Sequence, residues 1–316
     1  MAALCDPATP ATPAGPPAAA NAPDDDRDEK PIRTYKAIPA MPILTGMTCR
    51  EGRGAMQAIL FDLDGVLYQG NALLPGAAET VAWVRAEGIP HLFLTNTSSR
   101  PRAAIAEKLS RLGMDVPPSQ ILAPPAAARA WLEAEGIEDV ALFAPEATAE
   151  DFAGLNLLPA DAERGAGAVV VGDLGEGWSF RMLNRAFRLL MAKPAPRLLA
   201  LGMTRYWRAD GGLQLDAGPF VAALHYASGI EPVVLGKPAP AFFDAAVAAV
   251  GSTPVRTLMI GDDIRGDVAG AQQAGLRAAL VRTGKFRQSD LHGEIRPDAV
   301  LPGIGELPAW WSRHAG

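Results

Sequence analysis

The stretch Ala58-Ile-Leu-Phe-Asp-Leu-Asp-Gly-Val-Leu67 decides the fold of this chain. Its apolar run predicts a buried parallel strand that ends in Asp62, Asp64 and Gly65. Because residues i and i+2 of a strand point to the same side, we expect both carboxylates to aim at one place. Such close carboxylates repel each other unless a proton or a cation intervenes, and their oxygens suit Mg²⁺. The pattern favours phosphoryl transfer, with Asp62 as nucleophile and Asp64 as acid and base.

Taken alone, this motif also fits an ordinary strand followed by an aspartate-rich turn. A second apolar strand, Ile89–Leu94, leads to Thr95 and Asn96. A helix is predicted from Pro101 to Leu112, with Ser99 or Arg100 as its cap. The polar cluster before this helix is therefore either a cap or a site for an anion at the helix N-terminus.

Two further strand ends carry charged residues. Lys237 follows a short strand and a glycine and precedes Pro238, which favours a fixed cation over a solvated one. The strand Thr257–Ile260 leads to Asp262 and Asp263, with Asp267 beyond them, and Asp267 also fits the N-cap of a helix over 268–274.

These four strand ends predict an α/β fold with a doubly wound parallel sheet. In open sheets of this kind, ligands bind at the carboxyl ends of the strands. We therefore expect the four sets of polar residues to converge there, although each set alone has an ordinary structural interpretation.

The order Asp62-Leu-Asp64, Thr95-Asn96, Lys237-Pro238 and Gly261-Asp262-Asp263 resembles the four motifs of the haloacid dehalogenase superfamily. The long insert between the second and third motifs resembles the subclass IIA enzymes, which carry a large α/β cap there. The stretches that resemble the phospholysine phosphohistidine inorganic pyrophosphate phosphatase branch are Phe180–Leu190, Arg205–Arg208, Gly218–Phe220 and Val281–Phe286.

The resemblance implies a role for each motif residue. Asp62 would form an aspartyl phosphate, and Asp64 would protonate the leaving group and then activate water. Mg²⁺ would be held by Asp62, the backbone carbonyl of Asp64, and Asp262. The resemblance also implies that Thr95, Asn96 and Lys237 bind the phosphoryl group, and that Asp263 and Asp267 orient metal-bound water or hold Lys237.

The chain divides into three predicted parts. Residues 1–55 have the Ala- and Pro-rich composition of a disordered tail, and we expect translation to start instead at Met47 or Met56. Residues 56–125 and 233–316 form the predicted catalytic core. Residues 126–232 form the predicted cap, in which strands alternate with helices. The glycine cluster Gly172–Gly177 is expected to be a cap loop facing the active site.

Composition excludes several other classes of protein. The net charge of −6 gives no basic footprint for nucleic acid or for a membrane surface, and the apolar runs are only strand-length. Both cysteines, Cys5 and Cys49, precede the predicted fold, which favours a reducing cytoplasm. The expected partner is a small phosphorylated substrate, and the resemblance also implies a homodimer formed through the cap.

Three functions remain open at this level. The first is a Mg²⁺-dependent phosphatase acting on small phosphoesters, phosphoamides such as phospholysine or phosphohistidine, or inorganic pyrophosphate. The second is a phosphomutase or phosphotransferase on the same core, and the third is a catalytically idle binding protein. Trp178, Tyr206, Trp207 and Arg208 are candidates to contact the leaving group, although cap packing or a dimer contact explains them equally well.

Overall fold

The structure is a computed structural model, and it describes residues 55–209 and 212–315. The predicted tail, apart from Ala55, lies outside the described residues, as do both cysteines. Two parallel sheets with helices on them organise the described chain, which confirms the predicted α/β class.

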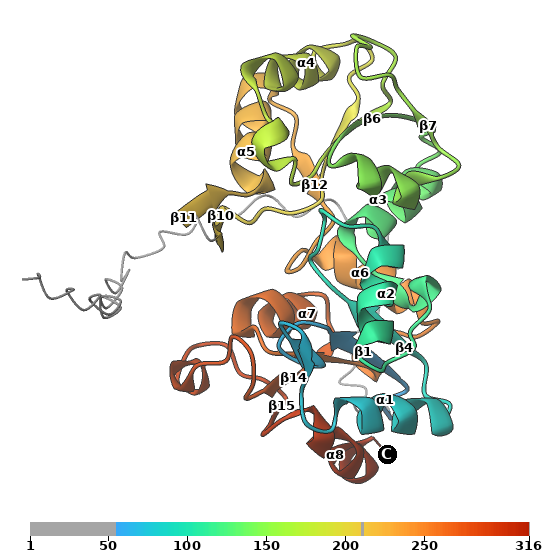
Figure 1. Cartoon of the computed structure of the whole chain (residues 1–316), viewed down its shortest axis with the longest axis vertical. Coiled ribbons are helices and arrows are strands. Elements are labelled where there is room, and N and C mark those ends of the chain that lie inside the picture. Colours follow the sequence, from blue (N-terminus) through green and yellow to red (C-terminus); the bar gives the residue numbers. More distant parts are fainter. Residues whose placement is uncertain (1–54, 210–211, 316) are drawn as a thin grey trace, which may run out of the picture. The chain divides into compact units, whose positions relative to one another are not determined.

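The first sheet has six strands in the order β15-β14-β13-β1-β4-β5. Every neighbouring pair in it is parallel. The strands are β1 (Ala58–Asp62), β4 (His91–Leu94), β5 (Ile121–Leu122), β13 (Thr257–Gly261), β14 (Arg277–Val281) and β15 (Ala299–Leu301). Figure 1 shows β1 in blue and β14 in orange in this sheet, and β1 from early in the chain pairs with β13 from its last quarter.

The second sheet has five parallel strands in the order β12-β9-β8-β6-β7. They are β6 (Asp139–Phe143), β7 (Asn156–Leu157), β8 (Ala168–Val171), β9 (Arg197–Ala200) and β12 (Pro232–Val234). Two small antiparallel hairpins complete the strands: β2 (Tyr68–Gln69) with β3 (Ala72–Leu73), and β10 (Tyr206–Ala209) with β11 (Gly212–Leu215).

Eight α-helices connect these strands in the described chain. They are α1 (Ala77–Ala86), α2 (Arg102–Arg111), α3 (Pro124–Ala134), α4 (Phe180–Leu190), α5 (Ala217–Ser228), α6 (Pro240–Ala249), α7 (Gly270–Gln273) and α8 (Leu307–His314). Proline occupies the first turn of α3 and of α6, where its missing N–H costs no helical hydrogen bond. Gly229 ends α5 in the left-handed conformation that glycine adopts readily.

Both faces of the six-stranded sheet are covered, which explains why its strands are continuous apolar runs. Ile59 and Phe61 belong to one hydrophobic cluster, whereas Leu60, between them, belongs to another. The second cluster also contains Val140 and Leu199 of the five-stranded sheet. Strand alternation therefore places neighbouring residues in different cores.

Two details of the structure differ from the sequence predictions. The short strand before Lys237, β12, pairs with β9 in the five-stranded sheet and not with the strands that carry the aspartates. The helix predicted from 268 begins earlier, as a π-helical turn over Ile264–Ala269 (η5) that continues into α7. Its cap is Asp263, which accepts hydrogen bonds from the backbone of Arg265 and Gly266, so Asp267 is not the N-cap.

Candidate active site

Three adjacent strands of the six-stranded sheet end in polar residues that are buried together. Asp62 is the last residue of β1, Thr95 follows β4, and Asp262 follows β13. All three side chains are buried, and they share the carboxyl edge of the sheet because the strands are parallel neighbours. This edge is where an open parallel sheet binds its ligands.

Lys237 reaches this edge from the loop after β12. Its Nζ lies 2.6 Å from Oδ1 of Asp62 and 2.7 Å from Oδ1 of Asp267, and its side chain is only 5% exposed. Burial alone would lower the pKa of Lys237, but the charges of Asp267 and Asp62 outweigh that effect and raise the pKa above its usual value. The ammonium is therefore a fixed, permanently charged group.

Asn96 holds Lys237 by its backbone. The Lys237 N–H donates to Oδ1 of Asn96 at 2.8 Å, and Nδ2 of Asn96 donates to the Lys237 carbonyl at 2.9 Å. The adjacent Thr95 hydroxyl shares a hydrogen bond with the Thr97 hydroxyl at 3.0 Å. The Asn96 side chain thus couples the turn after β4 to the loop that carries the lysine.

The carboxylates of Asp62, Asp262 and Asp267 offer oxygens that lie within 4.8 Å of one another. Burial raises the pKa of Asp262 and of Asp267 to about 6 and also raises the pKa of Asp62, although Lys237 opposes the last shift. Oδ1 of Asp262 is buried, and no described residue donates a hydrogen bond to it. Buried carboxylate oxygens that lack a donor fit a hard divalent cation.

Asp64 occupies a different place from the other predicted metal ligands. It is exposed, and its carboxylate does not belong to the buried cluster. The Gly65 N–H donates to the Tyr68 carbonyl at 2.7 Å and closes the turn that carries Asp64. Burial, followed by the charges of Asp64 and Asp62, raises the pKa of Tyr68 to about 12, so this phenol stays protonated beside the site.

Two glycines enclose Asp262. Gly65 and Gly284 both have positive φ angles, 85° and 60°, and a Cβ on either one would overlap the Asp262 carboxylate. The loop after β14, which contains Gly284, supplies two hydrogen bonds. The Thr283 hydroxyl donates to the Gly65 carbonyl at 2.5 Å, and the Lys285 N–H donates to Oδ2 of Asp262 at 2.7 Å. The loop after β14 therefore joins the turn at Gly65 in holding the Asp262 carboxylate in place.

Comparison with known proteins agrees with this geometry. Residues 59–157 match the family model of haloacid dehalogenase-like hydrolases, and residues 234–307 match a second, HAD-hydrolase-like model. The rat phospholysine phosphohistidine inorganic pyrophosphate phosphatase (Rattus norvegicus) is 39% identical over 81% of this chain and 94% of its own length. The chain belongs to the haloacid dehalogenase-like hydrolases.

Other members of the family are similar over comparable lengths. The bovine (Bos taurus) haloacid dehalogenase-like hydrolase domain-containing protein 2 is 39% identical over 79% of this chain and 92% of its own length. The crystal structure of a 4-nitrophenylphosphatase from Thermotoga maritima superposes with a TM-score of 0.71 at 26% identity, covering 80% of this chain and 97% of that one. The chain is a hydrolase of this family, and the relatives named as phosphatases support phosphatase activity.

In this haloacid dehalogenase-like hydrolase, the two remaining predicted aspartates have different environments. Asp267 is buried and pairs with Lys237. Asp263 caps η5, and Nζ of Lys285 lies 3.3 Å from its Oδ2. Sequence reasoning left open whether either residue holds the lysine, and the structure gives that contact to Asp267.

The loop Arg282–Lys285 was not predicted to take part in the site of this hydrolase. The stretch Val281–Phe286 was noted only for its resemblance to the phosphatase branch, and a Thr-Gly pair after a strand is a common turn composition. Its contacts with Asp262 and Gly65 join residues 23 and 218 positions apart, so they exist only in the folded chain. The available signal was the apolar strand ending at Val281, whose last four residues are buried next to the aspartate-bearing strand β13.

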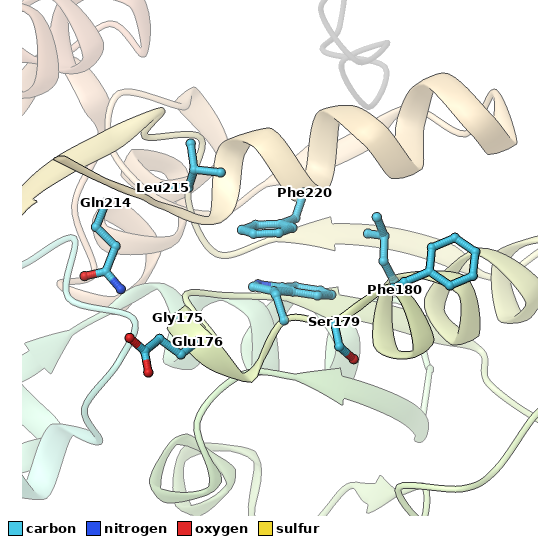
Figure 2. A pocket seen from close by; sticks show the side chains of 9 residues that line it. Gly175, Glu176, Ser179, Phe180, Gln214, Leu215 and Phe220 are labelled. Atoms are coloured by element: carbon cyan, nitrogen blue, oxygen red, sulfur yellow. The ribbon is translucent and has the colours of Figure 1, made fainter.

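The second sheet of the hydrolase carries an aromatic pocket near its own carboxyl ends. The pocket has a volume of about 400 Å³. Figure 2 shows Phe220 of α5 above it, Gln214 and Leu215 of β11 at one end, and Ser179 and Phe180 at the start of α4 at the other. Trp178 also lines it and stacks on Phe220 with ring centroids 4.6 Å apart.

Of the residues expected to contact the leaving group, only some are described. Trp178 stacks between Phe220 and Phe143 and is part of the packing of the second sheet. The Tyr206 side chain is exposed. The side chains of Trp207 and Arg208 lie outside the described part of the chain. Among the described residues, no helix is both long and apolar enough to span a bilayer.

Proposed function

We propose that this hydrolase is a Mg²⁺-dependent phosphatase that works through an aspartyl-phosphate intermediate on Asp62. The observation that carries the proposal is the buried set formed by Asp62, Asp262, Asp267 and Lys237. The Asp62 carboxylate is suited to attack phosphorus because Lys237 is a fixed cation beside it. The carboxylate oxygens of Asp262 and Asp267 lie next to both groups.

Asp62 attacks the phosphorus with one carboxylate oxygen while the other, Oδ1, accepts a hydrogen bond from Lys237. The P–O or P–N bond to the leaving group breaks, and Asp64 donates its proton to that group. Asp64 then removes a proton from water as the water oxygen attacks the phosphorus, which frees Asp62 and releases phosphate. One residue serves both steps because the first leaves it with the charge that the second needs.

The exposed position of Asp64 fits a group that exchanges protons with a leaving group and with water. Thr95 is proposed to donate its hydroxyl to the phosphoryl oxygens. Lys237 neutralises charge on those oxygens and on Asp62, and its rigid placement by Asn96 means that little reorganisation is needed during reaction.

The metal proposal rests on the carboxylate cluster. Asp62 and Asp262 would hold Mg²⁺ through carboxylate oxygens, and the backbone carbonyl of Asp64 would complete the protein ligands. Asp267 would act mainly through Lys237. When bound, the cation supplies charge neutralisation for the phosphoryl oxygens and for the crowded carboxylates.

The substrate class is proposed from the relatives. Enzymes named for phospholysine, phosphohistidine and inorganic pyrophosphate are 36–39% identical to this chain. We therefore place phosphoamides and pyrophosphate first among the candidate substrates, with small phosphoesters such as p-nitrophenyl phosphate as general probes. A homodimer formed through residues 126–232 and a cytoplasmic location complete the proposal.

The deciding experiment is phosphate release from a substrate panel by the wild type, with Mg²⁺ and with EDTA. The panel contains p-nitrophenyl phosphate, pyrophosphate, phospholysine, phosphohistidine and sugar phosphates. Turnover that requires Mg²⁺, with a trapped phosphoryl group on Asp62 by mass spectrometry, is the expected result. Transfer of the phosphoryl group back to substrate without release would point to a mutase, and binding without turnover would point to an idle site.

A further inference from the structure

Helix α2 begins six residues after Asn96 and does not cap itself. Pro101 occupies its N-cap position with an extended backbone, φ −68° and ψ 157°, and makes no side-chain cap hydrogen bond. The first turn of α2 contains no acidic residue. The predicted cap, Ser99 or Arg100, is therefore wrong, and the helix needs a partner for its exposed N–H groups and positive end from elsewhere.

That partner is Asp151, in the 3-10 segment Glu146–Phe152 (η2) that follows β6. Its Oδ2 accepts from the Arg102 backbone N–H at 3.1 Å, and its Oδ1 accepts from Nε of Arg102 at 2.7 Å. The Asp151 side chain is only 5% exposed. A carboxylate 49 residues away in the chain thus caps the first N–H group of α2.

A second contact from η2 reaches the other side of Pro101. The hydroxyl of Thr148, which is fully buried, donates to the Ser98 carbonyl at 3.2 Å. Thr148 and Asp151 lie on one short segment, so η2 fixes the chain at Ser98, three residues before Pro101, and at Arg102, directly after it. Loss of either contact would leave a buried polar group without its partner.

The segment fixed in this way continues the turn that carries Thr95 and Asn96. Thr95 shares a hydrogen bond with Thr97, and the Thr97 N–H donates to the Thr95 hydroxyl at 3.2 Å. Asn96 binds the backbone of Lys237. The turn is therefore held at one end by the lysine loop and at the other end, only three residues after Thr95, by η2.

We propose that Asp151 and Thr148 are positioning residues that set the Thr95–Asn96 turn for phosphate binding. The inference rests on the proposed function, because that function gives Thr95 its phosphate contact. Since a displaced donor makes longer and weaker hydrogen bonds, a turn released at its Ser98 end would bind phosphate more weakly.

The first test compares Asp151→Asn with Glu150→Gln. Both remove one negative charge from η2, but Glu150 is exposed, whereas Asp151 is bonded to α2. For Asp151→Asn we expect KM for p-nitrophenyl phosphate and the inhibition constant of inorganic phosphate to rise together by about tenfold, with a smaller change in kcat. For Glu150→Gln, both constants should stay within about twofold of wild type.

The second test uses Thr148, where one substitution removes the hydroxyl and another keeps it. Thr148→Val has a similar shape but cannot donate to the Ser98 carbonyl, whereas Thr148→Ser can. We expect the valine variant to weaken phosphate inhibition severalfold and the serine variant to restore it. This pair also carries the test if Asp151→Asn does not fold.

A third measurement separates this inference from the proposed function. Hydrogen–deuterium exchange of the peptide covering residues 95–104 should accelerate in Asp151→Asn and Thr148→Val, but not in Glu150→Gln. If the wild type turns over no phosphate compound, the proposed function fails while this exchange result still reports on the turn. Unchanged exchange together with unchanged phosphate inhibition in both folded variants would overturn the positioning role.

Discussion

The two parallel sheets of this protein have the same architecture but opposite chemistry at their carboxyl ends. In the six-stranded sheet, β1 and β13 lead to buried aspartates, and Lys237 lies between them. In the five-stranded sheet, the equivalent edge leads to an aromatic stack of Phe143, Trp178 and Phe220. One edge can hold cations and anions, whereas the other presents mainly apolar surface beside a few polar side chains.

This difference shows that the fold supplies a position and the side chains supply the function. Both edges gather residues distant in sequence, because parallel strands end together. Among the described residues, the first edge collects buried charges: Asp62 and Asp267 share the Lys237 ammonium, and the Asp262 carboxylate lies beside them. Three buried carboxylates beside one ammonium leave negative charge that suits the first edge to the proposed cation, whereas the aromatic rings of the second edge pack against one another.

The sharpest way to test the contrast is to neutralise one carboxylate at each sheet. Asp62→Asn should reduce turnover by about a thousandfold or more, because an amide oxygen is a poor nucleophile. Glu163→Gln, which removes a charge paired with Arg188 near the second sheet, should leave turnover within about twofold. The measurement is phosphate release under saturating Mg²⁺. Similar losses in both variants would contradict the assignment of the site to the first sheet.

Substitution of one glycine near each sheet also tests the difference between the two sheets. Gly284→Ala places a Cβ into the Asp262 carboxylate, whereas Gly229→Ala, at the end of α5, meets no described atom within 4 Å. Both glycines have positive φ, 60° and 70°, so both variants carry a similar backbone cost of about 1 kcal/mol.

We therefore expect similar losses of stability from the backbone but very different activities. Gly284→Ala should reduce kcat/KM by about a hundredfold, since Asp262 must move. Gly229→Ala should keep wild-type activity. Thermal unfolding of both variants measures the stability loss, and steady-state kinetics measure the activity. Normal activity in Gly284→Ala would show that the close packing of Gly65 and Gly284 against Asp262 is not needed for catalysis.

The stability that the buried aspartates of the six-stranded sheet contribute should also depend on pH in the metal-free protein. Burial raises the pKa of Asp262 and Asp267 from 3.8 to about 6, so the folded state binds protons more tightly than the unfolded state. The contribution of these groups to the free energy of unfolding is therefore greatest below pH 3.8 and falls as pH rises toward 6. Mg²⁺ competes with those protons, so its affinity should rise over the same interval.

Calorimetric Mg²⁺ titrations at pH 5 and pH 7 provide the measurement, with Asp262→Asn as the control. The wild type should bind Mg²⁺ more tightly at the higher pH, and the variant should lose most of this dependence. An affinity that does not change with pH would show that the buried carboxylates are not the ligands.

The smallest effect on activity is expected from the second sheet. Arg185 of α4 is buried and donates to the carbonyls of Ala162 and Pro159, with its guanidinium over the Phe143 ring. Arg185→Met leaves both carbonyls without this donor and should reduce stability by about 1–3 kcal/mol. Urea unfolding should record that loss, while kcat at 25 °C stays within about twofold. A large fall in kcat would show that the packing of Arg185 affects the proposed active site at the carboxyl ends of the six-stranded sheet.

Sequence patterns predicted most elements because their signals are local. The strand predicted over Thr257–Ile260 differs from β13 by one residue at its end, and the helix predicted over 101–112 differs from α2 by one residue at each end. The start of the helix after β13 was missed because Asp263 and Asp267 are both good capping residues, and only the backbone geometry shows which one caps. The cap of α2 was missed because it comes from Asp151, far along the chain.

Apolar runs and the aspartates that follow them are local features, so they can be read from the amino-acid sequence. They were enough to predict the α/β class and the candidates Asp62, Asp64, Thr95, Lys237 and Asp262. The contacts between these groups became visible in the folded chain: Lys237 bridges Asp62 and Asp267, Asn96 holds the Lys237 backbone, and the loop after β14 contacts Asp262. These contacts join residues from different strands and loops, so their geometry exists only after the sheets have packed.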